Sequence, residues 1–264
     1  MKLPQFIETH CHLDSLKEKS IDETVAAAAA VGVDKIITIA VNPQNLESVC
    51  QIAMQFENVY TTQGVHPHDA KNFSVEVLSQ IQKNALKHKK VVAIGEIGLD
   101  YHYNFSTPEE QKEVFDQQLQ LAVQLNLPVV IHSREADDDM IFFLEKYGPL
   151  LTRKGVLHSF SSTLKLAEVA IKQGFSLGFN GIITFKTADL VREALKITPL
   201  HQLVLETDSP YLAPTPHRGK ENNPSFIPLI AQKAYAIRGG ENKKNEEDFY
   251  QTIYHNSTAL FNLV

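Results

Sequence analysis

Short apolar segments alternate with longer amphipathic segments along most of the chain. The short segments are rich in branched aliphatic residues, and eight of them have the length and continuous hydrophobicity of buried strands. They are Gln5–Glu8, Lys35–Val41, Val59–Gly64, Val91–Gly95, Pro128–His132, Gly155–His158, Phe175–Phe179 and Gln202–Glu206. Strands that are apolar along their whole length are typical of a parallel sheet covered on both faces.

The segments between these strands have helical periodicity, with start and stop signals at their ends. The predicted helices are Asp22–Val31, Asn45–Phe56, Val75–Lys87, Pro108–Leu125, Glu135–Tyr147, Leu164–Lys172 and Ala188–Lys196. Thr107 places a capping hydroxyl before Pro108, and Gly32, Gly148 and Gly174 follow helical segments. Eight strand–helix units in about 210 residues predict an α/β protein with a (β/α)8 TIM barrel. A doubly wound open sheet is the weaker alternative, because the chain has no glycine-rich nucleotide-binding loop.

The C-terminal part of the chain adds more helical pattern than the barrel needs. Helical periodicity runs through about residues 224–262, and we expect these helices to pack outside the barrel. The polar stretch 238–245 is predicted to be a loop between two terminal helices. The chain has 264 residues, of which 43% are hydrophobic, and it contains no repeat, low-complexity tract or linker. We therefore expect one domain that spans residues 1–264.

Charge and cysteine content limit the possible classes of protein. The 25 Lys and Arg residues against 31 Asp and Glu residues give a net charge of −6, which argues against a broad basic surface for nucleic acid. An enzyme that contacts phosphate through metal ions is still compatible with this charge. Two cysteines imply no disulfide framework. With no signal peptide or membrane-spanning segment evident, we expect a soluble, cytoplasmic monomer that does not bind membranes.

The first strand is followed by two histidines that are separated by one residue. Side chains two apart on a strand point to the same face, so His10 and His12 can reach one point. Cys11 should point to the opposite face, where packing is expected instead of metal ligation. Neutral imidazole is the commonest metal ligand, but a His-x-His pair alone is equally compatible with two surface histidines.

Further along the chain, ligand-type residues recur where the predicted strands end. They are His66 and His68 after the third strand, Glu96 after the fourth, His132 after the fifth, His158 after the sixth and Asp208 after the eighth. TIM barrels place their active sites at this end of the strands, so the recurrence favours a divalent-metal site.

The barrel order divides these residues into two groups. The first and eighth strands should be neighbours, which brings His10, His12 and Asp208 together as one half of a metal site. His132 and His158 should form the other half, with the Glu96 carboxylate bridging the two. Such a bridge holds two cations in position for in-line displacement at phosphorus. Asp208 is suited to accept a proton from a metal-bound water.

Several longer motifs carry a resemblance to a known family. They are Thr-His-Cys-His-Leu-Asp (9–14), Gly-Val-His-Pro-His (64–68), Gly-Glu-Ile-Gly-Leu-Asp-Tyr (95–101), Gln-Lys-x-x-Phe (111–115), Leu-Pro-Val-Val-Ile-His-Ser-Arg (127–134), His-Ser-Phe-Ser (158–161), Glu-Thr-Asp-Ser-Pro-Tyr-Leu-Ala-Pro (206–214) and Arg-Gly-Lys-x-Asn-x-Pro (218–224). Together they resemble the TatD family of metal-dependent deoxyribonucleases, within the amidohydrolase-like barrels. They occur in the family's order and span nearly the whole chain.

The resemblance implies a hydrolase with two divalent metal ions (Mg, Mn or Zn) that cleaves phosphodiester bonds in DNA. A 3′–5′ exonuclease acting on single-stranded ends is the specific expectation. The metal ligands that it implies are His10, His12, Glu96, His132, His158 and Asp208. Glu96 and Asp208 are also the implied catalytic residues. The residues expected to contact substrate are His66, His68, Arg134 and Arg218, although His66 and His68 also suit a rigid loop turned by proline.

The chain departs from the family pattern at two places. Glu8 stands where the family usually has Asp, and Ser161-Ser162 lies in a segment that usually contains glycine. Two rival functions remain: a metal-dependent amidohydrolase or esterase acting on a small molecule or aminoacyl ester, and a non-catalytic binding module. The aromatic stretch 101–103 after Glu96 is compatible with stacking on a nucleobase or with a solvated loop.

Overall fold

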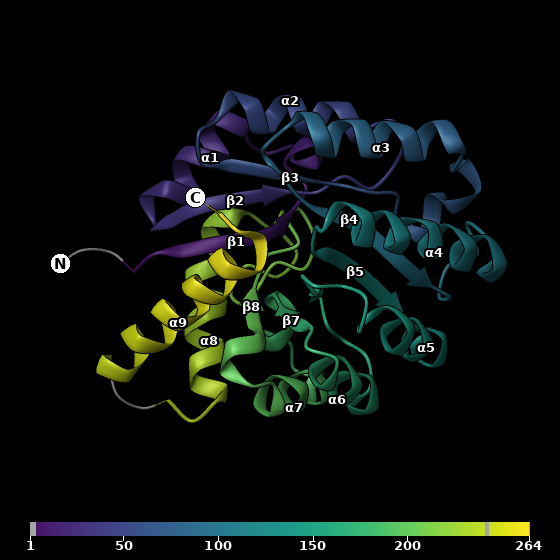
Figure 1. Ribbon diagram of the computed structural model, residues 1–264. Helices are drawn as coiled ribbons and strands as arrows, with labels where there is room; N and C mark the ends of the chain where they lie inside the picture. The colour runs from purple at the N-terminus through teal and green to yellow at the C-terminus, as the bar shows by residue number, and fades with distance from the viewer. Residues whose placement is uncertain (1–3, 241–242, 264) are drawn as a thin grey trace.

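The computed structural model of the protein describes residues 4–240 and 243–263, and its sheet has eight parallel strands in sequence order (Figure 1). The strands are β1 (Phe6–Cys11), β2 (Val33–Thr38), β3 (Val59–Gln63), β4 (Val91–Asp100), β5 (Val129–Arg134), β6 (Gly155–Leu157), β7 (Ser176–Phe179) and β8 (Leu203–Leu205). Beyond β8, the backbone N–H of Asp208 donates to His10 O at 2.9 Å, and His12 N–H donates to Ser209 O at 2.8 Å. These bonds bring the ends of the sheet together, and the predicted TIM barrel is confirmed.

Helices cover the outside of the sheet (Figure 1). They are α1 (Ile21–Ala30), α2 (Leu46–Gln55), α3 (Val75–Lys87), α4 (Pro108–Leu125), α5 (Asp137–Tyr147), α6 (Leu164–Lys172), α7 (Asp189–Ile197), α8 (Ile227–Ile237) and α9 (Lys243–Phe261). Short 3-10 turns are η1 (Leu13–Ser15), η2 (Pro67–Asn72), η3 (Gly181–Thr184), η4 (Leu200–Gln202) and η5 (Pro224–Phe226). At the start of α4, Thr107 and Glu110 form a reciprocal capping box, which explains why the predicted and observed boundaries coincide.

Apolar side chains form one buried layer outside the barrel and another inside it. Alternate strand residues divide between them: Val129 packs in the outer layer against the helices, whereas Val130 faces the inner layer. The inner layer consists of Ile7, Ile37, Ile39, Val92, Ala93, Val130, Val156 and Val204, together with Phe261 and Leu263. Cys11 is fully buried in the outer layer, as its position on the strand predicts.

The two C-terminal helices have different positions. α8 packs outside the barrel against α7 and η3, as expected. α9 instead crosses the N-terminal ends of the strands. Two hydrogen bonds show this position: Tyr254 OH donates to Asp34 Oδ2 at 2.6 Å, and Asn256 Nδ2 donates to Leu203 O at 2.9 Å. The expectation that the whole tail packs outside the barrel is therefore wrong for the end of α9.

The loop between these helices is shorter than predicted. Residues 243–245 of the predicted loop 238–245 already belong to α9, and residues 241–242 lie outside the described part of the chain. Within the described ranges, none of the helices has the combination of length and hydropathy that a bilayer-spanning helix requires.

Candidate metal centre

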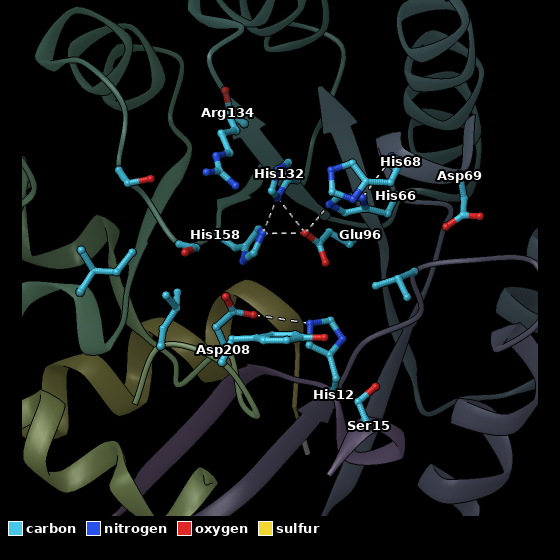
Figure 2. A pocket seen from close by; sticks show the side chains of 17 residues that line it. His12, Ser15, His66, His68, Asp69, Glu96, His132, Arg134, His158 and Asp208 are labelled. Carbon is cyan, nitrogen blue, oxygen red and sulfur yellow. Dashed lines mark hydrogen bonds and ion pairs between the residues drawn. The ribbon is translucent and has the colours of Figure 1, made fainter. Parts of the chain in front are cut away.

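The C-terminal ends of the strands surround a cavity of about 540 Å³ that is lined by most of the predicted site residues (Figure 2). The predicted residues in its lining are His12, His66, His68, Glu96, His132, Arg134, His158 and Asp208. His10 lies fully buried beside them. Arg218 is not among the lining residues, since its guanidinium stacks on the Phe185 ring at 3.6 Å and donates to Ala213 O.

One side of the centre is built where β1 meets the segment after β8. The Asp208 Oδ1 atom lies 3.5 Å from His12 Nε2 and 3.7 Å from His10 Nε2. Asp208 has a φ of 59°, a left-handed conformation that is uncommon for residues other than glycine, and its N–H is held by His10 O. The backbone thereby aims the carboxylate at both imidazoles. The expected grouping of His10, His12 and Asp208 is present in the structure.

Glu96 lies between this group and the histidines of the neighbouring strands (Figure 2). Its Oε2 atom is 3.4 Å from His10 Nε2. Its Oε1 atom is 2.7 Å from His158 Nε2, 3.1 Å from His132 Nδ1 and 3.4 Å from His66 Nε2. The two oxygens of one buried carboxylate therefore contact different imidazoles, as a bridging ligand requires.

The electrostatics of the centre depend on this crowding of opposite charges. Burial alone would raise the pKa of Glu96, but the imidazoles of His158, His66 and His10 outweigh it and hold the pKa well below its usual range. Burial alone would lower the pKa of His158, but the carboxylates of Glu96 and Glu206 raise it well above its usual value. The two pKa shifts are opposite in direction, as expected for a carboxylate and an imidazole that stabilise each other's charged forms.

The donor set fits a divalent cation. Burial and the proximity of His158 lower the pKa of His10, and neither ring nitrogen of His10 has a hydrogen-bond partner among the described residues. A neutral imidazole with a free lone pair is a metal-ligand form. In each of three groups of residues, the potential ligand atoms all lie within 4.8 Å of one another. The groups are His10/His12/Asp208, His66/Glu96/His132 and His10/His158/Glu206. Imidazole and carboxylate together accept several divalent metals. The assignment of individual ligands stays a prediction.

Comparison with known proteins agrees with this chemistry. The model of the family described as TatD related DNase matches residues 7–262. The chain belongs to the TatD family. It is a metal-dependent hydrolase, the description that its uncharacterised relatives from Bacillus subtilis and Escherichia coli carry.

Relatives of this TatD-family chain are similar over most of its length. An uncharacterized metal-dependent hydrolase of Bacillus subtilis, YabD, is 36% identical over 97% of this chain and 98% of its own. The 3′-5′ ssDNA/RNA exonuclease TatD of Cronobacter sakazakii is 37% identical over 83% of this chain and 84% of its own. The crystal structure of YjjV, a TatD homologue from Escherichia coli, superposes with a TM-score of 0.91 at 34% identity and covers 99% of both chains.

Asp100 is a site residue that the sequence analysis missed. Its Oδ2 atom lies 2.9 Å from His132 Nε2 and 3.0 Å from His68 Nε2, and the side chain is almost fully buried. When His132 Nε2–H donates to Asp100, the neutral ring keeps its lone pair on Nδ1, which faces Glu96. The sequence does contain a signal for it. Asp100 follows Glu96 by four residues, and this spacing places both side chains on one face of the strand if the strand continues.

Two further buried carboxylates, Glu206 and Glu8, contact residues of the centre or the backbone next to them. Glu206 Oε1 accepts the backbone N–H of Ser159 and lies 3.7 Å from His158 Nδ1. Glu8, the first departure from the family pattern, accepts the N–H groups of His10 at 2.9 Å and Thr207 at 3.0 Å. It therefore ties β1 to the segment after β8. Burial raises the pKa of Glu8 to about 8.

The four predicted substrate contacts occupy different places in this TatD-family site. His66 lies as close to Glu96 as His10 does, so it belongs to the cluster itself. His68 is hydrogen-bonded to Asp100. Arg134 lines the cavity, whereas Arg218 does not. Contact with substrate stays a prediction for all four. Ser161, in the second departure from the family pattern, lines the cavity wall.

Proposed function

We propose that this protein cleaves phosphodiester bonds in single-stranded DNA, removing nucleotides from the 3′ end with the help of two divalent cations. The observation that carries the proposal is the position of Glu96. Its Oε2 atom lies 3.4 Å from His10 Nε2 and its Oε1 atom lies 2.7 Å from His158 Nε2, so each oxygen contacts a different imidazole. A carboxylate in this position suits two cations about 3.5–4 Å apart, the spacing used for in-line displacement at phosphorus.

The residues of the cavity divide the work of such a reaction. Two divalent cations, when bound, supply Lewis acidity towards the phosphate oxygens and lower the pKa of water. Asp208 lines the cavity and takes a proton from the attacking water. Burial alone would raise the pKa of Asp208, but the hydrogen bond to His12 and the nearby imidazoles outweigh burial and lower the pKa, so the carboxylate stays ionised. Arg134 lines the cavity, where its guanidinium can bind phosphate oxygens in a bidentate manner.

The name of one relative supports nucleic acid as the substrate. The Cronobacter sakazakii protein is described as a single-stranded DNA and RNA exonuclease with 3′-5′ polarity. The net charge of −6 is compatible with this substrate because the cations and Arg134 bring positive charge to the phosphate locally. We propose that the protein acts on this substrate as a monomer.

The test is DNA cleavage by protein that has been stripped with a chelator and then supplied with Mg, Mn or Zn. The substrates are 5′-labelled single-stranded and double-stranded DNA. We expect a ladder that shortens from the 3′ end of the single strand only when metal is restored. Glu96→Ala and Asp208→Ala should each lose this activity by more than about 100-fold, because each removes a proposed ligand.

Glu168→Ala is the matched control, since it removes an exposed carboxylate from α6 on the outside of the barrel and should leave cleavage unchanged. Metal binding without any DNA cleavage would contradict the nuclease proposal. In that case the same proteins should be assayed on small esters, amides and aminoacyl esters. Absence of metal binding at micromolar concentrations would instead favour a non-catalytic barrel.

A further inference from the structure

Two exposed aromatic rings stand beside the cavity, in the loop between β4 and α4. Tyr103 is 43% exposed and Phe105 is 52% exposed. Their ring centroids are 5.4 Å apart with an interplanar angle of 30°, so the rings are stacked. We call these two side chains the aromatic platform. His68, which lines the cavity, has its ring centroid 4.9 Å from that of Phe105 and 5.4 Å from that of Tyr103.

The loop that carries the aromatic platform is fixed at both ends. The backbone N–H of Tyr103 donates to Asp100 Oδ1 at 3.2 Å. Ser106 Oγ donates to His68 O at 3.0 Å, and Gln111 Nε2 donates to the carbonyl oxygens of Asp100 and Ser106. The backbone therefore presents two stacked rings to solvent from an anchored loop.

Of the neighbouring aromatic residues, Tyr101 bonds elsewhere, and His102 packs edge-on against Tyr103, with ring centroids 4.6 Å apart. Tyr101 OH donates to Asp139 Oδ2 at 2.6 Å, and His102 Nδ1 lies 2.5 Å from Glu135 Oε1. The sequence stretch 101–103 thus contributes only Tyr103 to a stacking surface. Phe105, which lies outside that stretch, completes it.

A cation lies next to the aromatic platform on the cavity side. The Arg134 guanidinium carbon is 5.0 Å from the centre of the Tyr103 ring, within the range of a cation–π interaction. Arg134 also lines the cavity, and Figure 2 shows its guanidinium near His132 and His158. The two exposed rings are thus next to His68 and Arg134, which line the cavity that holds the candidate metal centre. A ligand that matches the rings, the guanidinium and the metal centre has an aromatic ring joined through a short linker to a phosphate.

We propose that the aromatic platform stacks on the base of a nucleotide whose phosphate lies at the metal centre. This inference rests on the proposed function and adds a subsite to it. Base–aromatic stacking does not depend on sequence, because every base has a π face. It does require an unpaired base, since a base inside a duplex is already stacked and covered. The aromatic platform therefore makes the site selective for single strands and tolerant of base identity.

The test compares two ligands that share a phosphate and differ in the base. Deoxyadenosine 5′-monophosphate and 2-deoxyribose 5-phosphate are titrated into the metal-loaded protein by isothermal calorimetry. We expect the nucleotide to bind wild type about tenfold more tightly, the size of one base–aromatic stack. Tyr103→Ala and Phe105→Ala should each reduce this advantage, and the double variant should remove it. Affinity for 2-deoxyribose 5-phosphate should not change.

Two controls separate stacking from general damage. Tyr103→Phe keeps the ring and should keep the advantage, and Phe142→Ala removes a 58% exposed ring from α5 without effect. Equal affinity for both ligands in wild type, no detectable nucleotide binding, or an advantage that survives in the double variant would each overturn the aromatic platform. A ring-dependent preference without DNA cleavage would support the platform and contradict the nuclease. Cleavage without the preference would keep the nuclease alone.

Discussion

The two ends of the barrel are filled with opposite kinds of side chain. At the N-terminal ends of the strands, α9 brings Phe261 and Leu263 against inward-facing aliphatic residues such as Ile37 and Val204. At the C-terminal ends, the inward-facing residues are imidazoles and carboxylates, several of them fully buried. The same strands therefore carry the close-packed inner apolar layer at one end and a dense group of ionisable side chains at the other.

The difference separates stability from chemistry within one sheet. Apolar packing needs no partner beyond its own neighbours, and it contributes to folding whether or not a cation is bound. Buried ionisable groups favour folding only when their charges are balanced, and here the balance depends on shared protons or on a bound cation. We therefore expect the N-terminal end to set the stability of the metal-free protein, and the C-terminal end to set its response to metal.

The largest effect is expected for Phe261→Ala at the N-terminal end. Removing a ring that is 1% exposed should lower the free energy of unfolding by about 3–5 kcal/mol. The loss should be the same with saturating cation and with chelator, because Phe261 lies in the inner apolar layer, at the opposite end of the barrel from the metal centre. Urea unfolding followed by circular dichroism measures it, with Phe142→Ala as a control that changes little. A loss that appears only in the presence of metal would contradict the separation.

Removing the metal should have a smaller effect, and it should act only through the C-terminal end. With the cation at 100 times its dissociation constant, chelation should lower the free energy of unfolding by about 2.7 kcal/mol. Phe261→Ala should lose the same amount on chelation, since distant sites add. Glu96→Ala should lose nothing, because its site no longer binds the cation. A full metal increment in Glu96→Ala would show that the cation binds elsewhere.

The sequence was sufficient for the barrel and for the residues that gather in the centre, for one physical reason. Parallel strands bring their C-terminal ends to one edge, so ligand-type residues after different strands must meet there. His10, His132 and Asp208, which are more than 70 residues apart in the chain, were placed together by this argument alone. His66 was expected to contact substrate, and the structure places its Nε2 atom 3.4 Å from Glu96 Oε1, inside the cluster of candidate ligands.

The residues that escaped prediction depend on tertiary contacts that no local pattern records. The predicted fourth strand ended at Gly95, which left Asp100 in a loop. In the structure β4 continues because it pairs with the polar end of β5, including Asp100 with Arg134. The end of α9 has an amphipathic pattern that fits any apolar surface, so its place across the strand ends could not be read from the sequence.

The smallest of the expected effects sharpens the comparison within the C-terminal end itself. Asp100→Asn keeps the shape of the side chain but turns an acceptor into an N–H donor opposite His132 Nε2, which lies 2.9 Å from the Asp100 Oδ2 atom. The ring should then carry its proton on Nδ1, where the lone pair towards Glu96 would otherwise be.

Metal affinity should consequently fall about 10- to 100-fold, the usual cost of losing the partner of a metal-binding histidine. A competition titration against a fluorescent chelator measures this change without relying on activity. Asp69→Asn is the matched control, because Asp69 also lines the cavity but its side chain bonds, among the described residues, to Asn72 and not to a candidate ligand. In the chelated protein, the free energy of unfolding should change less than the free energy of metal binding does. Equal metal affinity for Asp100→Asn and wild type would mean that His132 is oriented by packing alone, and that this end of the barrel needs no carboxylate behind its histidines.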